Sequence, residues 1–116
     1  MNHLKLGINS AFEIAKYVIT ICCLNKKPVT NIKLQMILYR FQLFYLQKTG
    51  ENLFYDEIQV RDYDVRIPSI DCLFTCNKQM FITELYNCYD IDLVKRDLIK
   101  PEIDRLSNMN LYKLTI

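Results

Sequence analysis

Apolar residues recur every three or four positions from Ala11 to Leu24, and this spacing predicts a helix with one buried side. Ser10 followed by Glu13 forms a capping box, in which each side chain satisfies a free backbone N–H at the helix start. The run 25–28 ends the helix through two lysines and a proline. The predicted buried residues are Ala11, Ile14, Ala15, Val18, Ile21 and Cys22.

A second helix is predicted at about 31–49, in a segment that is apolar nearly all the way round. Thr30 is its natural N-cap, and Gly50 ends it in a left-handed conformation. One apolar stripe consists of Leu34, Ile37, Leu38, Phe41 and Tyr45. A second stripe consists of Ile32, Met36, Tyr39, Leu43 and Leu46. Two stripes predict contacts on two sides, so we expect this helix to lie buried at the centre of the fold.

Polar side chains of this second helix fall into two groups. Lys33, Arg40 and Gln47 repeat every seven residues and form the single strip predicted to face water. Gln35 and Gln42 project from roughly the opposite side. A buried amide without partners costs about 1 to 3 kcal/mol, so each must bond a backbone group, another side chain or a ligand.

The pattern changes to a period of two after Gly50, because Ile58 and Val60 alternate with polar neighbours. This alternation predicts a short β-hairpin or extended ribbon at about 57–67. Such a ribbon has unpaired backbone groups. We expect the amides of Gln35 and Gln42 to satisfy them.

The rest of the chain predicts further helical pieces. Pro68 suits the first turn of a third helix that runs to about Cys76. The stretch 77–89 contains an apolar run, but helical spacing within it favours a helix. Asp92 and Pro101 mark the starts of the last two helical pieces. The buried residues expected in the third helix and the last pieces are Ile70, Leu73, Phe74, Leu93, Leu98, Ile99, Ile103 and Leu106. The fold class is therefore mainly α, a compact bundle of four to six helices around the central helix.

The composition predicts that the 116 residues form one domain, because the chain has only two glycines and three prolines and no linker-like segment. Five cysteines, an odd number without a CxxC motif, favour free thiols in or near the core of a cytoplasmic protein. The sole histidine, His3, makes a zinc site improbable. The apolar run 17–24 is far shorter than the roughly 20 residues that a membrane span needs.

Charge and motif content argue against two classes of function. The net charge is +2 and the 15 basic residues are scattered, so nucleic-acid binding is not favoured. A small prophage DNA-binding regulator remains an alternative, although the second helix offers only one basic strip. Gly7 and Gly50 cannot form a phosphate-binding loop, and cysteine–histidine catalysis would depend on His3. We therefore predict no catalytic, cofactor-binding or metal-binding residues.

An ordered motif gives a more specific indication. The segment Ile32-Lys33-Leu34-Gln35-Met36-Ile37-Leu38-Tyr39 is followed by Gln42, Tyr45, Leu46 and Thr49-Gly50. After it come Leu53-Phe54, Glu57-Ile58-Gln59-Val60, Tyr63 and Pro68. This order resembles the Panacea antitoxin domain, a phage-associated family. The motif positions carried over are Lys33, Leu34, Gln35, Leu38, Tyr39, Gln42, Tyr45, Gly50 and Pro68.

This chain departs from the family pattern in three places. Asp64-Val65 replaces a glycine-proline turn, so that turn uses a different backbone conformation. Val60 occupies the position of a tryptophan. The ending 114–116 stops where relatives often continue, so we expect a shortened C-terminus.

The resemblance implies a protein-binding function. Such domains hold a cognate protein toxin inactive by direct contact, and one relative delivers its toxin to a protease as an adaptor. The candidate contact residues are Tyr55, Tyr63, Asp64 and Arg66, whereas Tyr39 and Tyr45 are expected in the core. A homo-oligomer is a further alternative, because a chain of this size with many aromatic residues leaves apolar surface uncovered.

Overall fold

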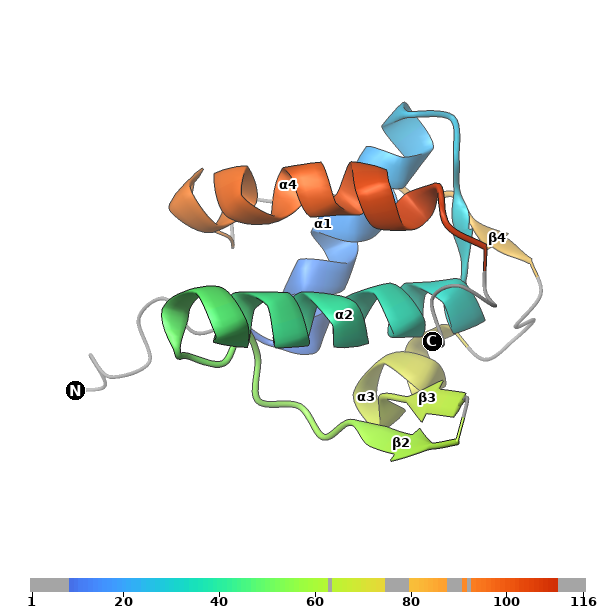
Figure 1. Ribbon diagram of the computed structural model, residues 1–116. Helices are drawn as coiled ribbons and strands as arrows, with labels where there is room; N and C mark the ends of the chain where they lie inside the picture. Colours follow the sequence, from blue (N-terminus) through green and yellow to red (C-terminus); the bar gives the residue numbers. More distant parts are fainter. Residues whose placement is uncertain (1–8, 63, 75–79, 88–90, 92, 111–116) are drawn as a thin grey trace.

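The structure, a computed structural model, describes residues 9–62, 64–74, 80–87, 91 and 93–110. These residues are mostly helical and carry two small antiparallel sheets, β1–β4 and β2–β3 (Figure 1). The elements in chain order are α1 (Ala11–Leu24), β1 (Val29–Thr30), α2 (Asn31–Thr49), β2 (Gln59–Arg61), β3 (Asp64–Arg66), α3 (Pro68–Asp71), the 3-10 helix η2 (Cys72–Phe74), β4 (Phe81–Ile82) and α4 (Leu93–Ser107).

Helix α1 has the predicted bounds and the predicted cap. The Ser10 hydroxyl accepts a hydrogen bond from the Glu13 backbone N–H at 3.2 Å, and Glu13 Oε1 accepts one from the Ser10 N–H at 3.0 Å. The buried face is wider than predicted, since Tyr17 and Ile19 are also buried whereas Ile21 is partly buried. Helices α2, α3 and α4 all contact α1, so more of its surface is covered than one amphipathic stripe indicates.

Helix α2 also has the predicted bounds, with the Thr30 hydroxyl as cap and Gly50 left-handed at φ +77°. Its first stripe is buried as predicted. The prediction of a second buried stripe is wrong for three of its five members, because Ile32, Leu43 and Leu46 are 39%, 45% and 40% exposed. The other two agree better, since Met36 is buried and Tyr39 is partly buried. Figure 1 shows why: α2 lies in front of α1, with α4 along one side and the β2–β3 hairpin and α3 along the other. The packed neighbours cover the back and the sides of α2.

The predicted water-facing strip of α2 is wrong for two of its three members. Lys33 is partly buried, and its Nζ donates a 2.7 Å hydrogen bond to the carbonyl oxygen of Ser107 at the end of α4. Arg40 is also partly buried, and only Gln47 is exposed. Helix α4 packs along this side of α2, so the long stems of the cations lie beside it.

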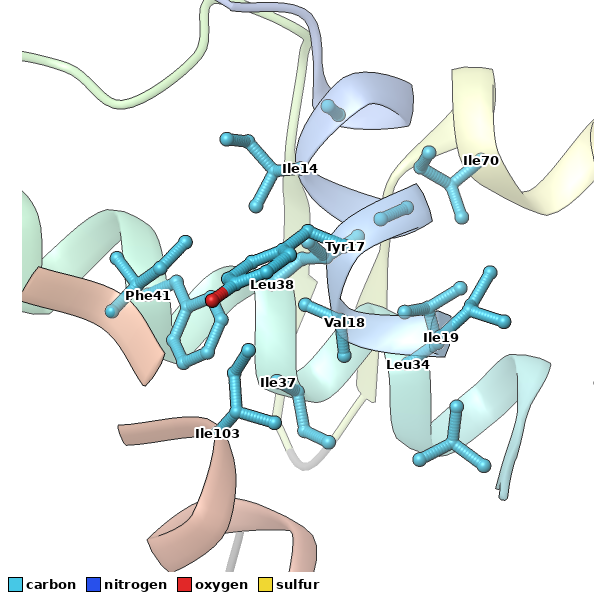
Figure 2. Close-up of a cluster of buried hydrophobic side chains, with 14 of the residues drawn as sticks. Ile14, Tyr17, Val18, Ile19, Leu34, Ile37, Leu38, Phe41, Ile70 and Ile103 are labelled. Atoms are coloured by element: carbon cyan, nitrogen blue, oxygen red, sulfur yellow. The ribbon is translucent and has the colours of Figure 1, made fainter. Parts of the chain in front are cut away.

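The core lies where α1, α2 and α4 meet, and Figure 2 shows this cluster. Fully burying one such side chain contributes about 1.5 to 3 kcal/mol. The buried side chains labelled in Figure 2 are Ile14, Tyr17, Val18, Ile19, Leu34, Ile37, Leu38, Phe41, Ile70 and Ile103.

The predicted hairpin is present as β2 and β3. Val60 pairs with Val65, and Arg61 pairs with Asp64. Asp62 in the turn has a φ of +45°, which agrees with the tolerance of aspartate for left-handed conformations. Tyr63 lies outside the described residues.

The third helix begins at Pro68 as predicted but is shorter. Helix α3 ends at Asp71, and the chain tightens into η2. Ile70 is buried and Phe74 is partly buried, but Leu73 is more than half exposed, so its predicted burial is wrong.

The helix predicted at 77–89 is wrong within the described part of that stretch. Phe81 and Ile82 form β4, which pairs with β1 through Ile82 to Val29 and Phe81 to Thr30. A strand partner far away in sequence therefore overrides the local helical spacing. Phe81 and Leu85 are exposed, so their spacing does not mark a buried face, and Cys88 lies outside the described residues.

The last two helical pieces are one helix. Helix α4 continues through Pro101, although proline cannot donate to the carbonyl of Asp97. Ile99, Ile103 and Leu106 are buried on both sides of the proline, so packing holds the two halves together. Leu93 is exposed rather than buried, and Leu98 is partly buried. The predicted start, Asp92, lies outside the described residues.

Candidate protein-binding surface

Gln35 is the centre of a buried polar network that joins α2 to α3. Its Nε2 donates to Asn31 Oδ1 and to Asp71 Oδ1, each at 3.0 Å. Its Oε1 accepts a 2.7 Å hydrogen bond from the backbone N–H of Ile67, the residue directly after β3. Asn31 Nδ2 donates to Asp71 Oδ1 and to the Phe74 carbonyl, both at 3.2 Å. The amide of Gln35 therefore fixes the point at which the hairpin leads into α3.

The charge of this network is carried by Asp71, which is 5% exposed. Two amides donate to its Oδ1, and Arg66 Nε lies 3.4 Å from its Oδ2. The Arg66 side chain stays largely exposed, so the guanidinium reaches from the surface of the hairpin to a buried carboxylate. Donors to a buried carboxylate offset the loss of its hydration. The same contact holds the end of β3 against α3.

Gln42 performs the same task about two turns further along α2. Its Oε1 accepts from the Leu53 N–H at 2.7 Å and from the Phe54 N–H at 3.4 Å. Its Nε2 donates to the Phe54 carbonyl at 2.6 Å and to Asn52 Oδ1 at 3.2 Å. The prediction that each amide bonds neighbouring backbone is confirmed. Gln42 binds the segment before the hairpin, however, and not the hairpin itself.

Asp56 provides a further attachment that the sequence did not reveal. Its Oδ1 accepts a 2.8 Å hydrogen bond from the Ala11 N–H in the first turn of α1, and its Oδ2 accepts one of 2.5 Å from the Ser69 hydroxyl. An aspartate beside a helix N-terminus satisfies a free donor and suits the positive end of the helix dipole. No sequence signal places Asp56 there, because Ala11 is 45 residues away.

These bonds hold residues 52–67, which we call the arm, against the helices. Phe54 and Ile67 in the arm are fully buried, yet Tyr55 between the two attachments is 66% exposed. Val60 in β2 is about half exposed, and Asp64 and Arg66 in β3 are exposed. We call Tyr55, Val60, Asp64 and Arg66 together the arm surface. Val60 pairs with Val65 and shares its face of the hairpin, whereas Asp64 and Arg66 lie on the other face. Three of the four predicted contact residues thus lie on one attached segment, and the fourth, Tyr63, is outside the described residues.

The remaining motif residues build the scaffold. Leu34, Leu38 and Tyr45 are buried, and Tyr39 is partly buried. Gly50 and Pro68 mark the end of α2 and the start of α3. Lys33 bonds the end of α4, and burial lowers the pKa of its ammonium group. The motif residues therefore serve mainly to pack the core and to attach the arm to α2.

Lys95 of α4 is a buried cation that the sequence analysis missed. Its Nζ donates to Asn9 Oδ1 at 2.9 Å and lies 6.0 Å from the centre of the Tyr45 ring. A cation over a ring face is attracted by the negative face of the π-system. Lys95 thereby ties α4 to α2 and to the residue before the α1 cap.

The two thiols at the end of α1, Cys22 and Cys23, are held in the neutral form. Burial raises the pKa of the Cys22 thiol to about 11, and it also raises the pKa of Cys23, so both favour the neutral form. Cys72 is exposed, which corrects the prediction that it lies in or near the core. Cys76 and Cys88 lie outside the described residues. Within the described ranges, no three His, Cys, Asp or Glu side chains group as metal ligands would.

Two findings complete the description. In the part of the chain that the structure describes, no helix has both the length and the apolar content to cross a membrane. Comparisons with protein-family models, with curated proteins and with solved structures found no match to this chain.

Proposed function

We propose that this chain is a cytoplasmic protein-binding module of the antitoxin type, which holds a cognate protein toxin inactive by direct contact through the arm surface. The observation that carries the proposal is the attachment of the arm by Gln42 at one end and Gln35 at the other, with Tyr55 exposed between them. An exposed aromatic side chain on a fixed backbone is typical of an interface anchor.

Attachment matters because binding must overcome the entropy lost when an interface is ordered. The backbone on both sides of Tyr55 is already held, by Gln42 at Phe54 and by Asp56 at α1 and α3. A partner that covers Tyr55 and Val60 therefore gains apolar burial without first ordering the arm. Arg66, the residue type most suited to planar polar contacts, lies at the end of β3.

The resemblance to the Panacea antitoxin domain supports the same conclusion. The two glutamines of the family-like motif are the side chains that hold the arm in this chain. We extend the proposal to the arrangement of the fold, a bundle around α2 with the arm as its contact platform. Val60 at the tryptophan-like position and Asp64-Val65 in β3 would then adapt the platform to a particular toxin.

Co-expression with the product of the neighbouring reading frame tests the proposal. If that product is toxic, we expect this chain to restore growth and to co-purify with it. Tyr55→Ala and Val60→Asp should weaken the complex by about tenfold or more, the loss typical of a hot spot. Leu93→Ala is a matched control, because Leu93 is also 66% exposed but lies at the start of α4.

Two outcomes would contradict the proposal. One is a toxic neighbour that this chain neither neutralises nor binds. The other is salt-dependent binding of this chain to its own promoter DNA, which would favour the DNA-binding regulator. If growth is restored only when a cellular protease is present, the chain acts as an adaptor, and the arm surface would then present the toxin to that protease.

A further inference from the structure

A second apolar surface lies around β4. Its exposed apolar residues come from the end of α1, from η2, and from β4 with the residues just before and after it. Each is more than half exposed: Leu24, Leu73, Met80, Phe81 and Leu85. Contiguous apolar surface of this kind marks an interaction site in a folded protein.

This surface is hollowed by two cavities. The first, of about 280 Å³, is lined by Leu73, Phe74 and residues 80–84. The second, of about 310 Å³, is lined by residues 23 and 24, Pro28, Thr83 and Leu85. Thr83 lines both, so the cavities are neighbours along one segment of backbone. We call the two cavities together the β4 groove.

The backbone between the cavities is exposed and lies between two attached points. Before this stretch in the sequence, β4 pairs with β1. After it, the backbone N–H of Tyr86 donates a 2.9 Å hydrogen bond to Thr20 Oγ1. No hydrogen bond joins the backbone N–H and C=O groups of Thr83, Glu84 and Leu85 to another described residue. All three residues are exposed. Exposed backbone donors and acceptors beside apolar pockets are what a protein offers when a partner adds an extended strand.

The charges near the groove distinguish between two candidate occupants, a second copy of this chain and a segment of a different protein. The carboxylate residue Glu84 lines the first cavity. Leu24 and Pro28 line the second cavity, and the exposed Lys26 lies between them in the sequence. Two copies paired antiparallel about Glu84 would place two carboxylates opposite each other, which is unfavourable. A segment with a basic residue near Glu84 and an acidic residue near Lys26 complements both ends.

We propose that the β4 groove binds an extended segment of a partner protein. The segment pairs with the backbone of residues 83–85 and inserts one apolar side chain into each cavity. Its basic residue lies beside Glu84 and its acidic residue beside Lys26. This site is separate from the arm surface and does not depend on the identity of a toxin.

A random peptide library displayed on phage tests the groove with the purified full chain. We expect enrichment of peptides with two apolar residues, flanked by a basic residue on one side and an acidic residue on the other. For a synthetic peptide of that sequence, Leu85→Asp should weaken binding by about tenfold or more. Val94→Asp, an equally apolar and exposed position on α4, should leave binding unchanged.

A charge exchange provides the sharper measurement. Glu84→Arg should weaken binding of the selected peptide, and a peptide with its basic residue replaced by glutamate should restore it. Addition of the peptide should also slow hydrogen exchange at the amides of Thr83, Glu84 and Leu85. Tyr55→Ala should bind the peptide as well as the wild-type chain does, which separates this site from the proposed toxin surface.

Three results would overturn the inference. The library enriches no peptide beyond a control surface, or the enriched peptides bind Leu85→Asp as tightly as wild type. In the third, light scattering shows a dimer of the wild-type chain that Leu85→Asp converts to a monomer, so a second copy occupies the groove. Circular dichroism of each variant establishes that it is folded.

Discussion

The side-chain oxygen of Gln35 accepts a 2.7 Å hydrogen bond from the backbone N–H of Ile67, 32 residues further along the chain. Both residues are buried, so water cannot replace this bond. This bond attaches the C-terminal end of the arm to α2, and the bonds of Gln42 attach its N-terminal end. These two amides therefore stabilise the fold and fix the position of the arm at the same time.

Replacement of Gln35 tests the buried network. Gln35→Met keeps the shape of the side chain but leaves the Ile67 N–H without its acceptor and removes a donor from Asp71. We expect the free energy of unfolding to fall by about 2 to 3 kcal/mol, as measured by urea denaturation. Gln47→Met on the exposed side of α2 is the matched control and should change it by less than about 0.5 kcal/mol. Equal effects of the two substitutions would contradict the role of Gln35.

Replacement of Gln42 should have a more local effect. Gln42 is partly buried, so water can reach some of the groups that Gln42→Met releases. We expect a loss of about 1 to 2 kcal/mol and faster hydrogen exchange at the amides of Leu53 and Phe54. The amide of Ile67 should keep its protection, because Gln35 still holds it. Unchanged exchange at Leu53 would show that Gln42 does not hold the arm.

Pro101 interrupts α4, and its replacement should stabilise the protein. Pro101→Ala allows a backbone hydrogen bond to the carbonyl of Asp97 and removes a residue that is unfavourable in a helix interior. Loss of the proline also makes the unfolded chain more flexible, which offsets part of this gain. We expect a net gain of about 1 to 2 kcal/mol in thermal unfolding. Lys100→Ala, at the exposed position before it, serves as the control, and a lower Tm for Pro101→Ala would contradict the prediction.

Cys22 should make stability depend on alkaline pH. Burial raises the pKa of its thiol in the folded chain from 9.0 to about 11. The unfolded chain therefore loses this proton first, and the contribution of the neutral thiol, complete below pH 9, is lost as the pH rises toward 11. The loss attributable to Cys22 is about 2 kcal/mol. The slope of unfolding free energy against pH in this range should be shallower for Cys22→Ala than for wild type.

The ends of α1 and α2, and one apolar stripe on each of these helices, were predictable from the sequence. The Ser10–Glu13 capping box, the Thr30 cap and the left-handed Gly50 act within one turn of backbone, so local residues suffice to specify them. The need of Gln35 and Gln42 for partners was also readable, since a buried amide must be satisfied wherever it lies.

Other features depended on contacts between residues far apart in sequence. Lys33 is partly buried because the end of α4, 74 residues later, lies beside it. Residues 81–82 form a strand because β1 offers them a partner. The attachment of Asp56 to the start of α1 has the same origin. The sequence by itself determined where α1 and α2 begin and end and which of their sides are apolar. The tertiary structure decided which of those sides are covered, because burial is a property of neighbours that the chain brings together only on folding.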